Sequence, residues 1–436
     1  MKPPLVYVLV INWNGLEHLR ECFDTLLAST YANVRFVLID NASTDGSVEF
    51  VRDTYGGDSR VETLECAANL GWAGGNNAGM EKAIAAGADF VFLLNNDTAT
   101  APDAIENLVE AAERCPNAGA LAPKMLLYDH PGLLNSVGLE CSRVGSSWDL
   151  GIGRLDAPRW NEERQVIGVC GGAAFFRVEA LSRTGLLPTD FTIYLDDLDL
   201  CLRIWDAGYE VWSCPAATVR HKYSATMGQG KQLRRKYYLN TRNRLRVILR
   251  NFPAAKLPWV LTLYKLGELR AIGRALLDRA PWRAGAHIRA ACAGLAYLPA
   301  ALRQRRRRGR GPCRFWPLIR TDRMFFQGVE FPTDGWYAER VVAGRRVRPI
   351  SARARRTVEA GRLRVLLVDC YPRLGSASVE VRQNGVVMAS LETSGADETV
   401  IEVASGTLEF VAGRVFEAED TGETFDIGGW LALERG

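Results

Sequence analysis

Carboxylate side chains follow predicted strands at several points in the first half of the chain. Asp40 comes directly after the predicted strand from Val34 to Ile39, and Asp97 lies just past the apolar run from Phe90 to Leu94. A further cluster, Asp196 to Asp199, places three carboxylates in four residues. Carboxylates so close together repel one another unless a cation or a proton-accepting role uses them. The pattern favours a divalent cation held by a carboxylate and substrate phosphates, beside a general base, and so transfer of a group carried on a nucleotide.

The elements that position these side chains alternate between strand and helix. Strands are predicted at 5–11, 34–39, 61–64 and 90–94. Helical spacing of apolar residues follows the first of them, and a glycine-rich loop at 69–79 is expected to open another helix. Such alternation is typical of βαβ units in a mostly parallel sheet, whose ligands bind outside the carboxyl ends of the strands. The expected fold class is therefore α/β, with a mostly parallel sheet flanked by helices.

The later parts of the chain differ in composition. Residues 166–177 are predicted to form another strand, with glycines that allow close backbone approach. No acidic residue occurs between Glu210 and Glu268 or between Asp278 and Asp322, and helical periodicity runs through this basic region. Short strands separated by turns follow and indicate a β-sandwich. We expect three parts: a first domain at 1–230, a basic helical segment at 231–327 and a β-sandwich accessory domain at 328–436.

The basic helical segment suggests contact with an anionic membrane surface. Leu269, Ile272, Leu276 and Leu277 form an apolar stripe, and arginines lie off it. The aromatic residues expected at such an interface are Trp259, Tyr264, Trp282 and Tyr297. The alternative is a helical hairpin that packs on the first domain and has a solvated basic face. We favour the membrane interpretation.

Composition sets the remaining limits. The chain has 436 residues, 47% hydrophobic and 24% charged, with a net charge of +4, which is ordinary globular material. Its 10 cysteines are scattered without a Cys-x-x-Cys pair, which fits a reducing compartment. No signal peptide is expected, and no segment reaches the roughly 20 apolar residues that span a bilayer. We expect a cytoplasmic protein, peripheral on the inner face of the cell membrane, with no nucleic-acid partner.

Six motifs, in this order and at these spacings, make residues from about 5 to 230 resemble the family 2 glycosyltransferases of GT-A fold, and within them the rhamnosyltransferase-like members. They are Val10-Ile-Asn-Trp-Asn-Gly15, Leu38-Ile-Asp-Asn-Ala-Ser-Thr-Asp-Gly-Ser47, Asn69-Leu-Gly-Trp-Ala-Gly-Gly-Asn-Asn-Ala-Gly79, Leu93-Leu-Asn-Asn-Asp-Thr98, Tyr194-Leu-Asp-Asp-Leu-Asp-Leu200 and His221.

The resemblance implies roles for single residues. Asp40 would grip the nucleobase or ribose, and a loop containing Gly74 and Asn76 would close on the nucleotide. Asp97 and His221 would hold Mg²⁺ or Mn²⁺ on the diphosphate. The full set expected to bind the donor is Asn12, Asp40, Gly74, Asn76, Asn96 and Asp97.

The resemblance also assigns the reaction. Asp197 would be the general base that deprotonates the acceptor hydroxyl, and Asp196 would contact the acceptor. A single displacement inverts the anomeric centre. The donor expected is a nucleotide sugar, dTDP-L-rhamnose, and the acceptor a hydroxyl of a cell-envelope or polysaccharide glycan, lipid-linked. The Gln-x-x-Arg-Trp motif of processive synthases is absent after Asp197, which favours one sugar per event.

Two positions depart from the family pattern. Asn95 replaces the first aspartate of the Asp-x-Asp motif and removes one charge from the expected metal site. Asp196 replaces a glutamate and is one methylene shorter. Other polar residues have simpler explanations: Asp199 could complement the dipole of a helix, Asp45 could be a cap, and Trp72 could be plain core.

Other functions fit the sequence less well. The main alternative is a catalytically inactive glycan-binding protein that acts through its β-sandwich, against which the intact Asp97, Asp197 and His221 argue. A sugar nucleotidyltransferase would need a basic glycine-rich loop after the first strand. A dinucleotide-dependent dehydrogenase would need Gly-x-Gly-x-x-Gly there. The residues present, Asn12-Trp-Asn-Gly15, fit neither.

Overall fold

The computed structural model describes residues 2–128, 132–154, 156, 158–222, 231–308, 313–320, 340–342, 345–350, 353–358, 360–368, 377–393, 396–412, 416–420, 423–427 and 429–435. The chain forms two compact units, the first of residues 1–152 with 157–326 and the second of residues 153–156 with 327–436. Residues 230, 327 and 328, at the predicted domain boundaries, lie outside the described residues.

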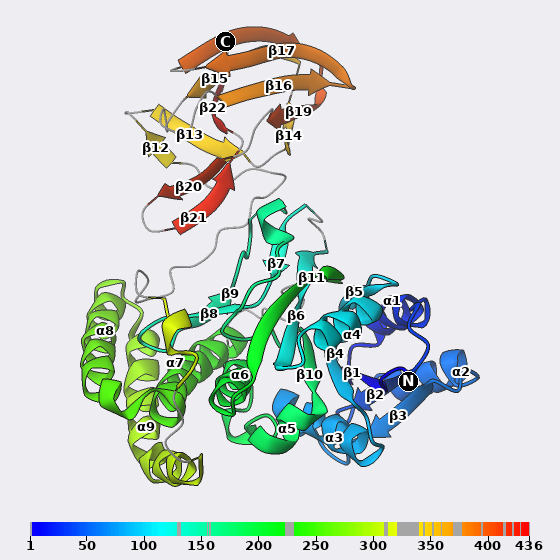
Figure 1. Ribbon diagram of the computed structural model, residues 1–436. Helices are drawn as coiled ribbons and strands as arrows, with labels where there is room; N and C mark the ends of the chain where they lie inside the picture. The colour runs from blue at the N-terminus through cyan, green and yellow to red at the C-terminus, as the bar shows by residue number, and fades with distance from the viewer. Residues whose placement is uncertain are drawn as a thin grey trace. The chain divides into compact units, whose positions relative to one another are not determined.

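The first unit is built on a nine-stranded sheet in the order β3-β2-β1-β4-β10-β6-β11-β5, with β7 paired to β6 (Figure 1). The strands of this unit are β1 (Val6–Asn12), β2 (Val34–Asp40), β3 (Val61–Glu65), β4 (Phe90–Asn95), β5 (Thr98–Thr100), β6 (Ala118–Leu127), β7 (Leu134–Ser136), β8 (Leu139–Cys141), β9 (Ser147–Asp149), β10 (Ala173–Arg177) and β11 (Glu210–His221). Strands β3, β2, β1 and β4 run parallel, as do β6 and β11. Strand β10 runs antiparallel to its neighbours β4 and β6. The expected α/β fold with a mostly parallel sheet is confirmed.

Helices cover both faces of this sheet. They are α1 (Leu16–Leu27), α2 (Ser47–Tyr55), α3 (Gly71–Ala85), α4 (Ala104–Arg114), α5 (Val178–Thr184), α6 (Asp196–Asp206), α7 (Lys231–Asn251), α8 (Leu257–Leu277) and α9 (Pro281–Arg308), with short 3₁₀ helices η1 (Pro158–Trp160), η2 (Thr189–Phe191), η3 (Ala254–Lys256) and η4 (Trp316–Leu318). Alternate residues of β1 point to opposite faces. Val8 belongs to a core shared with α1, α2 and α4, whereas Leu9 belongs to one shared with α3, α5 and α6. The sheet is therefore buried on both sides, which explains the continuous apolar runs of its strands.

Two local predictions were wrong. The glycine-rich stretch expected to be a loop is helical from Gly71 onward. A Cβ at Gly75 would lie 2.8 Å from Ile11 Cδ1, and one at Gly79 would lie 2.3 Å from Ile39 Cδ1. These glycines thus let α3 pack closely on β1 and β2. The predicted strand at 166–177 is confined to β10, because the chain turns just before it, where the N–H of Ala173 donates to the carbonyl of Cys170.

The helices α7, α8 and α9 belong to the first unit and pack against one another. Tyr264 and Tyr297 were expected at a membrane interface, and this was wrong. Both are buried in the core that α7 completes, and the Tyr297 hydroxyl accepts a hydrogen bond from Arg250 at 3.0 Å. Trp259 is exposed and Trp282 is half-buried. Among the described residues, no helix combines the length and apolar character that crossing a bilayer requires.

The second unit consists of antiparallel strands. They are β12 (Arg340–Val342), β13 (Arg345–Ile350), β14 (Arg353–Val358), β15 (Gly361–Val368), β16 (Ala377–Gln383), β17 (Val386–Thr393), β18 (Ala396–Val403), β19 (Gly406–Ala412), β20 (Phe416–Asp420), β21 (Glu423–Ile427) and β22 (Gly429–Arg435). A five-stranded sheet, β12-β13-β22-β15-β18, supplies Val365 and Ile401 to its interior, and a four-stranded sheet, β14-β19-β16-β17, supplies Val381 and Phe410. The expected β-sandwich is confirmed. The turn between β16 and β17 has positive φ at Asn384 and Gly385, as an Asn-Gly hairpin requires.

Candidate active site

Polar side chains from β1, β2 and the end of β4 form one hydrogen-bonded cluster. Asn12 and Asp40 are register partners at the carboxyl ends of β1 and β2. Asn12 donates from Nδ2 to Asp40 Oδ1 at 3.4 Å and accepts at Oδ1 from Asn96 Nδ2 at 2.6 Å. The backbone N–H of Ser43 donates to Asp40 Oδ2 at 2.9 Å. Three of the predicted donor-binding residues are therefore brought together at the edge of the sheet where such folds bind ligands.

Asp97 and His221 meet because β5 pairs with β11. His221 is the register partner of Thr98, and the backbone N–H of Lys222 donates to the carbonyl of Asp97 at 3.0 Å. His221 Nε2 lies 3.2 Å from Asp97 Oδ1, and both side chains are nearly buried. Burial raises the pKa of Asp97, but the hydrogen bond and charge of His221 outweigh it and hold that pKa below its usual value.

Asn135 lies beside Nδ1 of His221, and this contact determines the role that Nε2 of the same ring can take. Nδ1 lies 2.6 Å from Asn135 Oδ1, an acceptor, so Nδ1 is a donor and would carry the single proton of the ring in its neutral form. The lone pair of Nε2 then faces Asp97 Oδ1, and two acceptors at that distance need a proton or a cation between them. Ligand atoms about 2.1 Å from an octahedral ion and at right angles to each other lie about 3 Å apart. Asp97 and His221 therefore fit two positions around Mg²⁺ or Mn²⁺.

Asn95, which stands where the family has its first aspartate, does not join this pair. Its Oδ1 accepts from Trp72 Nε1 at 3.2 Å and is thus occupied. No group of three or more His, Cys, Asp or Glu side chains within the described ranges could hold a metal ion. A cation bound by Asp97 and His221 would take its remaining ligands from water and from donor phosphates, the usual arrangement for magnesium.

Asp197 is the second residue of α6 and keeps part of its side chain exposed. Its Oδ2 accepts from the backbone N–H of Gly171 at 3.0 Å, and its Oδ1 from that of Leu198 at 2.7 Å. Burial raises the pKa of Asp197 to about 6, although both N–H groups act to lower it. Such a carboxylate is largely ionised at neutral pH and is still basic enough to accept a hydroxyl proton.

The two consecutive glycines before β10 join Asp197 to the Asp97–His221 pair. Gly171 donates to Asp197, and a Cβ at Gly172 would lie 3.3 Å from His221 Cε1. A Cβ at Gly171 would lie 2.7 Å from the Trp72 ring, which itself bonds to Asn95. The glycines therefore allow Trp72, Asp197 and His221 to gather around one stretch of backbone. Trp72, for which plain core was an open alternative, packs on the core and also borders this site.

Other candidate residues lie away from this group or are engaged elsewhere. Asp196 is buried, and burial with the adjacent charge of Asp197 raises its pKa well above the usual value. Asn76 is fully buried, and its Nδ2 donates to the carbonyl of Trp72 inside α3. Gly74 lies in α3, where a Cβ would meet Leu70 at 2.8 Å. The acceptor role of Asp196 and the donor roles of Gly74 and Asn76 stay predictions.

Asp199 and Asp45 have the structural roles that the simpler explanations gave them. Asp199 lies in the first turn of α6 and forms ion pairs with Arg203 Nε at 2.9 Å and Arg250 Nε at 3.0 Å. Asp45 accepts from the backbone N–H of Leu16 at 2.9 Å and from Ser47.

Two residues near the site carried no signal in the sequence. Asn135 is fully buried against His221, and its Nδ2 has no hydrogen-bond partner in the part of the chain that the structure describes. Asp149 acts electrostatically on both Asp197 and His221, and burial raises its pKa. Both come from the region of short strands β7 to β9, which shows neither clear periodicity nor a motif. Only the backbone pairing of β7 with β6 places Asn135 there.

The first part of the chain is similar in sequence to known proteins. Residues 7–185 match the sequence model of the family described as Glycosyl transferase family 2. An N-acetylglucosaminyl-diphospho-decaprenol L-rhamnosyltransferase of Mycobacterium tuberculosis (strain ATCC 25618 / H37Rv) is 28% identical over 245 residues, which are 51% of this chain and 77% of that protein. The uncharacterized protein y4gI of Sinorhizobium fredii is 28% identical over 238 residues, 52% of this chain. The match spans only 25% of the length of y4gI.

A crystal structure of S. aureus TarS 1–349 in complex with UDP-GlcNAc has a TM-score of 0.47 and 15% sequence identity, and covers 80% of this chain and 96% of TarS 1–349. A likeness at this level decides nothing about ligands. The family match and the motifs it contains define the class: the first unit carries a family 2 glycosyltransferase domain, similar in sequence to a rhamnosyltransferase.

Proposed function

We propose that this chain is an inverting, cation-dependent glycosyltransferase that moves a sugar from a nucleoside diphosphate to an acceptor hydroxyl. The observation that carries the proposal is the gathering of Asp97, His221 and Asp197 around Gly171 and Gly172, inside a family 2 domain. Two residues that could hold a cation, beside a half-buried aspartate whose pKa is about 6, are what metal-assisted displacement needs.

The chain's own residues supply the parts of a single displacement. Asp97 and His221 would hold Mg²⁺ or Mn²⁺, and a cation bound there neutralises charge on the leaving diphosphate. Asp40 and Asn12 would hold the nucleoside end of the donor at the edge of β1 and β2. Asp197 would take the proton of the acceptor hydroxyl while that oxygen bonds to the anomeric carbon. The bond from that carbon to the diphosphate breaks, its electron pair leaves with the diphosphate, and the configuration inverts.

The proposed donor is dTDP-L-rhamnose, and the proposed acceptor is a hydroxyl of a lipid-linked glycan of the cell envelope. Sequence similarity to a rhamnosyltransferase whose name specifies a diphospho-decaprenol acceptor supports both. Asp40 Oδ1 and Oδ2 already accept hydrogen bonds from Asn12 and Ser43, which hold the carboxylate in one orientation. A nucleobase would donate a further hydrogen bond to this oriented carboxylate.

We test this proposal with a donor panel. Purified protein is incubated with Mg²⁺ or Mn²⁺ and dTDP-L-rhamnose, UDP-sugars or GDP-sugars, with a polyprenyl-diphosphate-linked N-acetylglucosamine as acceptor, and released nucleoside diphosphate is measured. We expect release with one donor, dependent on both metal and acceptor, and an inverted anomeric configuration by NMR. Absence of release with every donor would contradict the proposal.

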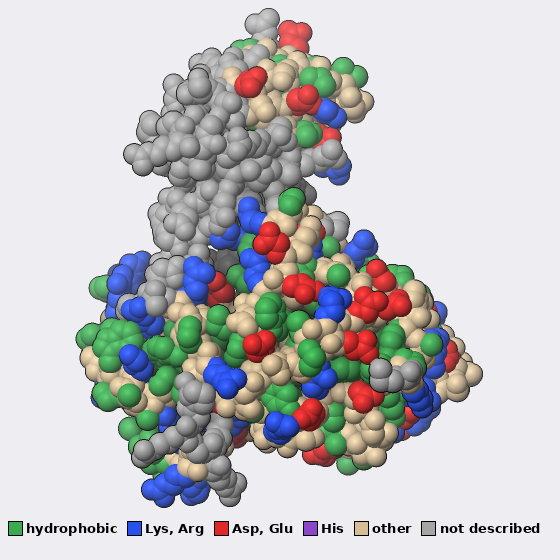
Figure 2. Space-filling model, in the orientation of Figure 1, with side chains coloured by type: hydrophobic (Ala, Val, Ile, Leu, Met, Phe, Trp, Pro, Cys, Tyr) green, Lys and Arg blue, Asp and Glu red, His purple; other side chains and the backbone are tan. Residues whose placement is uncertain are grey.

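The same proposal extends to the surface of α8 and α9, where hydrophobic and basic side chains mix (Figure 2). Leu269 is 67% exposed and Leu277 is 81% exposed on α8, and Leu295 is 74% exposed on α9. Arg270 and Arg274 are exposed beside the two leucines of α8. Exposed apolar stripes flanked by arginine fit the surface of an anionic bilayer, where a lipid-linked acceptor would be found.

A further inference from the structure

The segment that leads into Asp196 and Asp197 has an unfavourable backbone. Thr192, Tyr194 and Leu195 have φ angles of 73°, 72° and 65°, in the left-handed region that residues with a Cβ avoid. Such a conformation persists only where the surroundings hold it. Leu195 ends this segment and begins α6, since its carbonyl accepts from the N–H of Asp199 at 3.0 Å.

One side chain of α7 binds most of this backbone. Asn243 is fully buried, and its Nδ2 lies 2.9 Å from each of the carbonyl oxygens of Phe191, Ile193 and Tyr194. Carbonyl oxygens only accept, so the amide must present its nitrogen to them. Its oxygen in turn accepts from Arg242 Nε at 3.0 Å, which agrees with that orientation.

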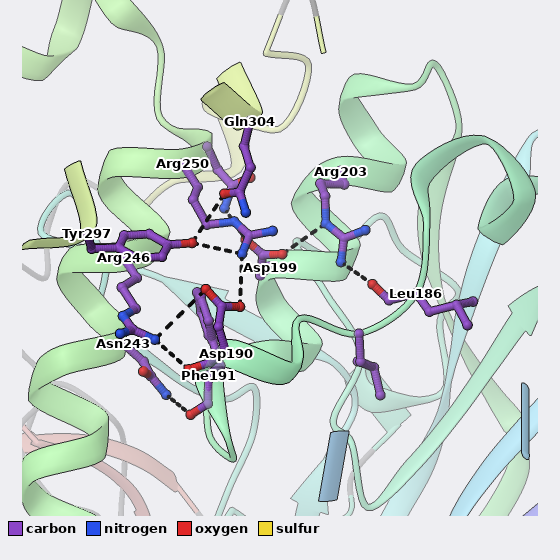
Figure 3. Close-up of polar contacts among 12 residues, drawn as sticks. Leu186, Asp190, Phe191, Asp199, Arg203, Asn243, Arg246, Arg250, Tyr297 and Gln304 are labelled. Carbon is purple, nitrogen blue, oxygen red and sulfur yellow. Dashed lines mark hydrogen bonds and ion pairs between the residues drawn. The ribbon is translucent and has the colours of Figure 1, made fainter. Parts of the chain in front are cut away.

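Three arginines of α7, which lie near Asn243 in the sequence, bind the start of the segment that precedes α6. Arg242 Nη2 donates to the carbonyl of Phe191 at 2.7 Å, and Arg246 donates to the carbonyl of Asp190. Arg250 forms ion pairs with Asp190 at 3.4 Å and with Asp199 at 3.0 Å. Figure 3 shows Asn243, Arg246 and Arg250 pointing from α7 toward the chain around Asp190, Phe191 and Asp199.

We propose that Asn243 is a positioning residue for the sugar-transfer reaction. It fixes the backbone of residues 192–195, three of which have positive φ, so that α6 begins at Asp196 and Asp197 lies against the N–H of Gly171. The carbonyl of Thr192 would lie 3.4 Å from a Cβ at Gly71, so the same backbone also borders the start of α3. This inference rests on the proposed function, because it assumes that Asp197 is the base.

The test replaces Asn243 with leucine, which has nearly the same shape and no donor. The carbonyls of Ile193 and Tyr194 then lose this donor, while that of Phe191 keeps Arg242, so the segment relaxes and Asp197 moves from its place. A displacement of about 1 Å can cost about 10²-fold in rate. We expect kcat to fall by about that factor while the KM for the acceptor and the Kd for the nucleotide sugar change less than about twofold, because the donor cluster lies on β1, β2 and β4.

The matched control is Asn240→Leu on the same helix. Asn240 Nδ2 donates to the carbonyl of Lys236 within α7 and touches no carbonyl of residues 191–195, so kcat should stay at the wild-type value. A second variant, Asn243→Ser, keeps one hydroxyl donor and should lose less activity than Asn243→Leu. It also serves if the leucine variant does not fold, which thermal unfolding would reveal.

The outcomes separate the two proposals. Wild-type kcat in both Asn243 variants, or equal losses in kcat and donor affinity, would overturn the positioning role. If Asp197→Asn abolishes transfer in the same assay while the Asn243 variants are fully active, the proposed function stands and this inference fails. A wild-type protein without transfer, or an active Asp197→Asn variant, would overturn the proposed function itself.

Discussion

At the residue scale, the surroundings of Asp97 and Asp197 shift the pKa values of the two carboxylates in opposite directions. The pKa of Asp97 is held below its usual value by His221, despite burial, whereas burial raises that of Asp197 to about 6. A carboxylate that stays ionised suits a cation, and one poised near neutrality suits a proton acceptor. Opposite displacement of pKa values in neighbouring acids is a recognised way to assign their roles.

The raised pKa of Asp197 predicts a pH dependence. The base must be ionised, so kcat/KM should rise with pH and level off above about 6. The titratable groups that interact electrostatically with Asp197 are Asp149, Asp196, Cys170 and Cys201, and the charge of Asp149 raises the pKa of Asp197. A pH–rate profile measured at saturating metal checks this. A profile flat between pH 5 and pH 8 would contradict a base with that pKa.

The same shift has a consequence for stability. A folded-state pKa above the usual value of 3.8 means that Asp197 favours the folded state at low pH and that this contribution is lost as pH rises through about 6. Asp197→Asn removes this titration. The variant should therefore gain thermal stability relative to wild type between pH 4 and pH 8, as unfolding midpoints at the two pH values would show. If the difference in unfolding midpoint between the variant and wild type were the same at both pH values, the pKa of Asp197 would not be shifted by folding.

The metal pair predicts a second set of effects. Asp97→Ala and His221→Ala would each remove one of the two proposed protein ligands, so the Mn²⁺ concentration for half-maximal donor binding should rise at least tenfold. Calorimetric titration of nucleotide sugar at graded Mn²⁺ measures this independently of turnover. Asn95→Ala is the control, because the oxygen of Asn95 is bound to Trp72 and should not touch the ion. A larger effect from Asn95 than from Asp97 would contradict the assignment.

Sequence could place Asn12, Asp40, Asn96 and Asp97 because each follows an apolar run, and parallel strands deliver their carboxyl ends to one edge. His221 could be placed only through its resemblance to the family. Asn135 and Asp149 could not be predicted at all, since β7 and β9 are only three residues long and pair with the nearby strands β6 and β8. Asn135 comes close to His221 because β6 pairs in turn with the distant strand β11.

At the element scale, α3 shows how composition can mislead. Glycine is a poor helix former, so the stretch from Asn69 to Gly79, which contains four glycines, predicts a loop. The helix forms nonetheless, because Gly75 and Gly79 remove side chains that would collide with Ile11 and Ile39. Tertiary packing overrides local propensity here, and no local pattern reveals which strand residues the glycines face.

Two glycines in helices should respond in opposite ways to alanine. A Cβ at Gly79 would lie 2.3 Å from Ile39, and overpacking of this kind costs about 1–3 kcal/mol. A Cβ added at Gly273 on α8 would meet open space, so Gly273→Ala should stabilise the folded protein by about 0.5–1 kcal/mol through helix propensity. Urea unfolding of both variants measures the two changes. Equal effects of the same sign would contradict the packing role of α3.

At the scale of the whole molecule, the basic helices have two faces with different tasks. The inner face buries Tyr264 and Tyr297 and carries Asn243 to the segment before Asp197. The outer face exposes Leu269, Leu277 and Leu295. Helical periodicity predicted the apolar stripe but not which aromatic residues turn inward, because that depends on how the three helices pack.

The outer face predicts binding to anionic vesicles. The protein should co-sediment with phosphatidylcholine vesicles containing phosphatidylglycerol and much less with phosphatidylcholine alone, and high salt should weaken binding. Leu269→Glu with Leu277→Glu should reduce affinity at least tenfold, since each buried leucine contributes about 1.5–3 kcal/mol. Val386→Glu with Val387→Glu, exposed on β17, is the control. If light scattering shows that the wild-type protein is a dimer and that the Leu269→Glu, Leu277→Glu variant is a monomer, the exposed leucines form a contact between two copies of the chain instead.

The most direct test of the proposed site compares donor binding with sugar transfer in one variant. Asp197→Asn removes the base but leaves Asp97, His221, Asp40 and Asn12 in place. The variant should bind nucleotide sugar with Mn²⁺ as tightly as wild type and transfer sugar at least about 10³-fold more slowly. Transfer at the wild-type rate, or loss of donor binding together with transfer, would contradict the assignment of Asp197 as the base beside the Asp97–His221 pair.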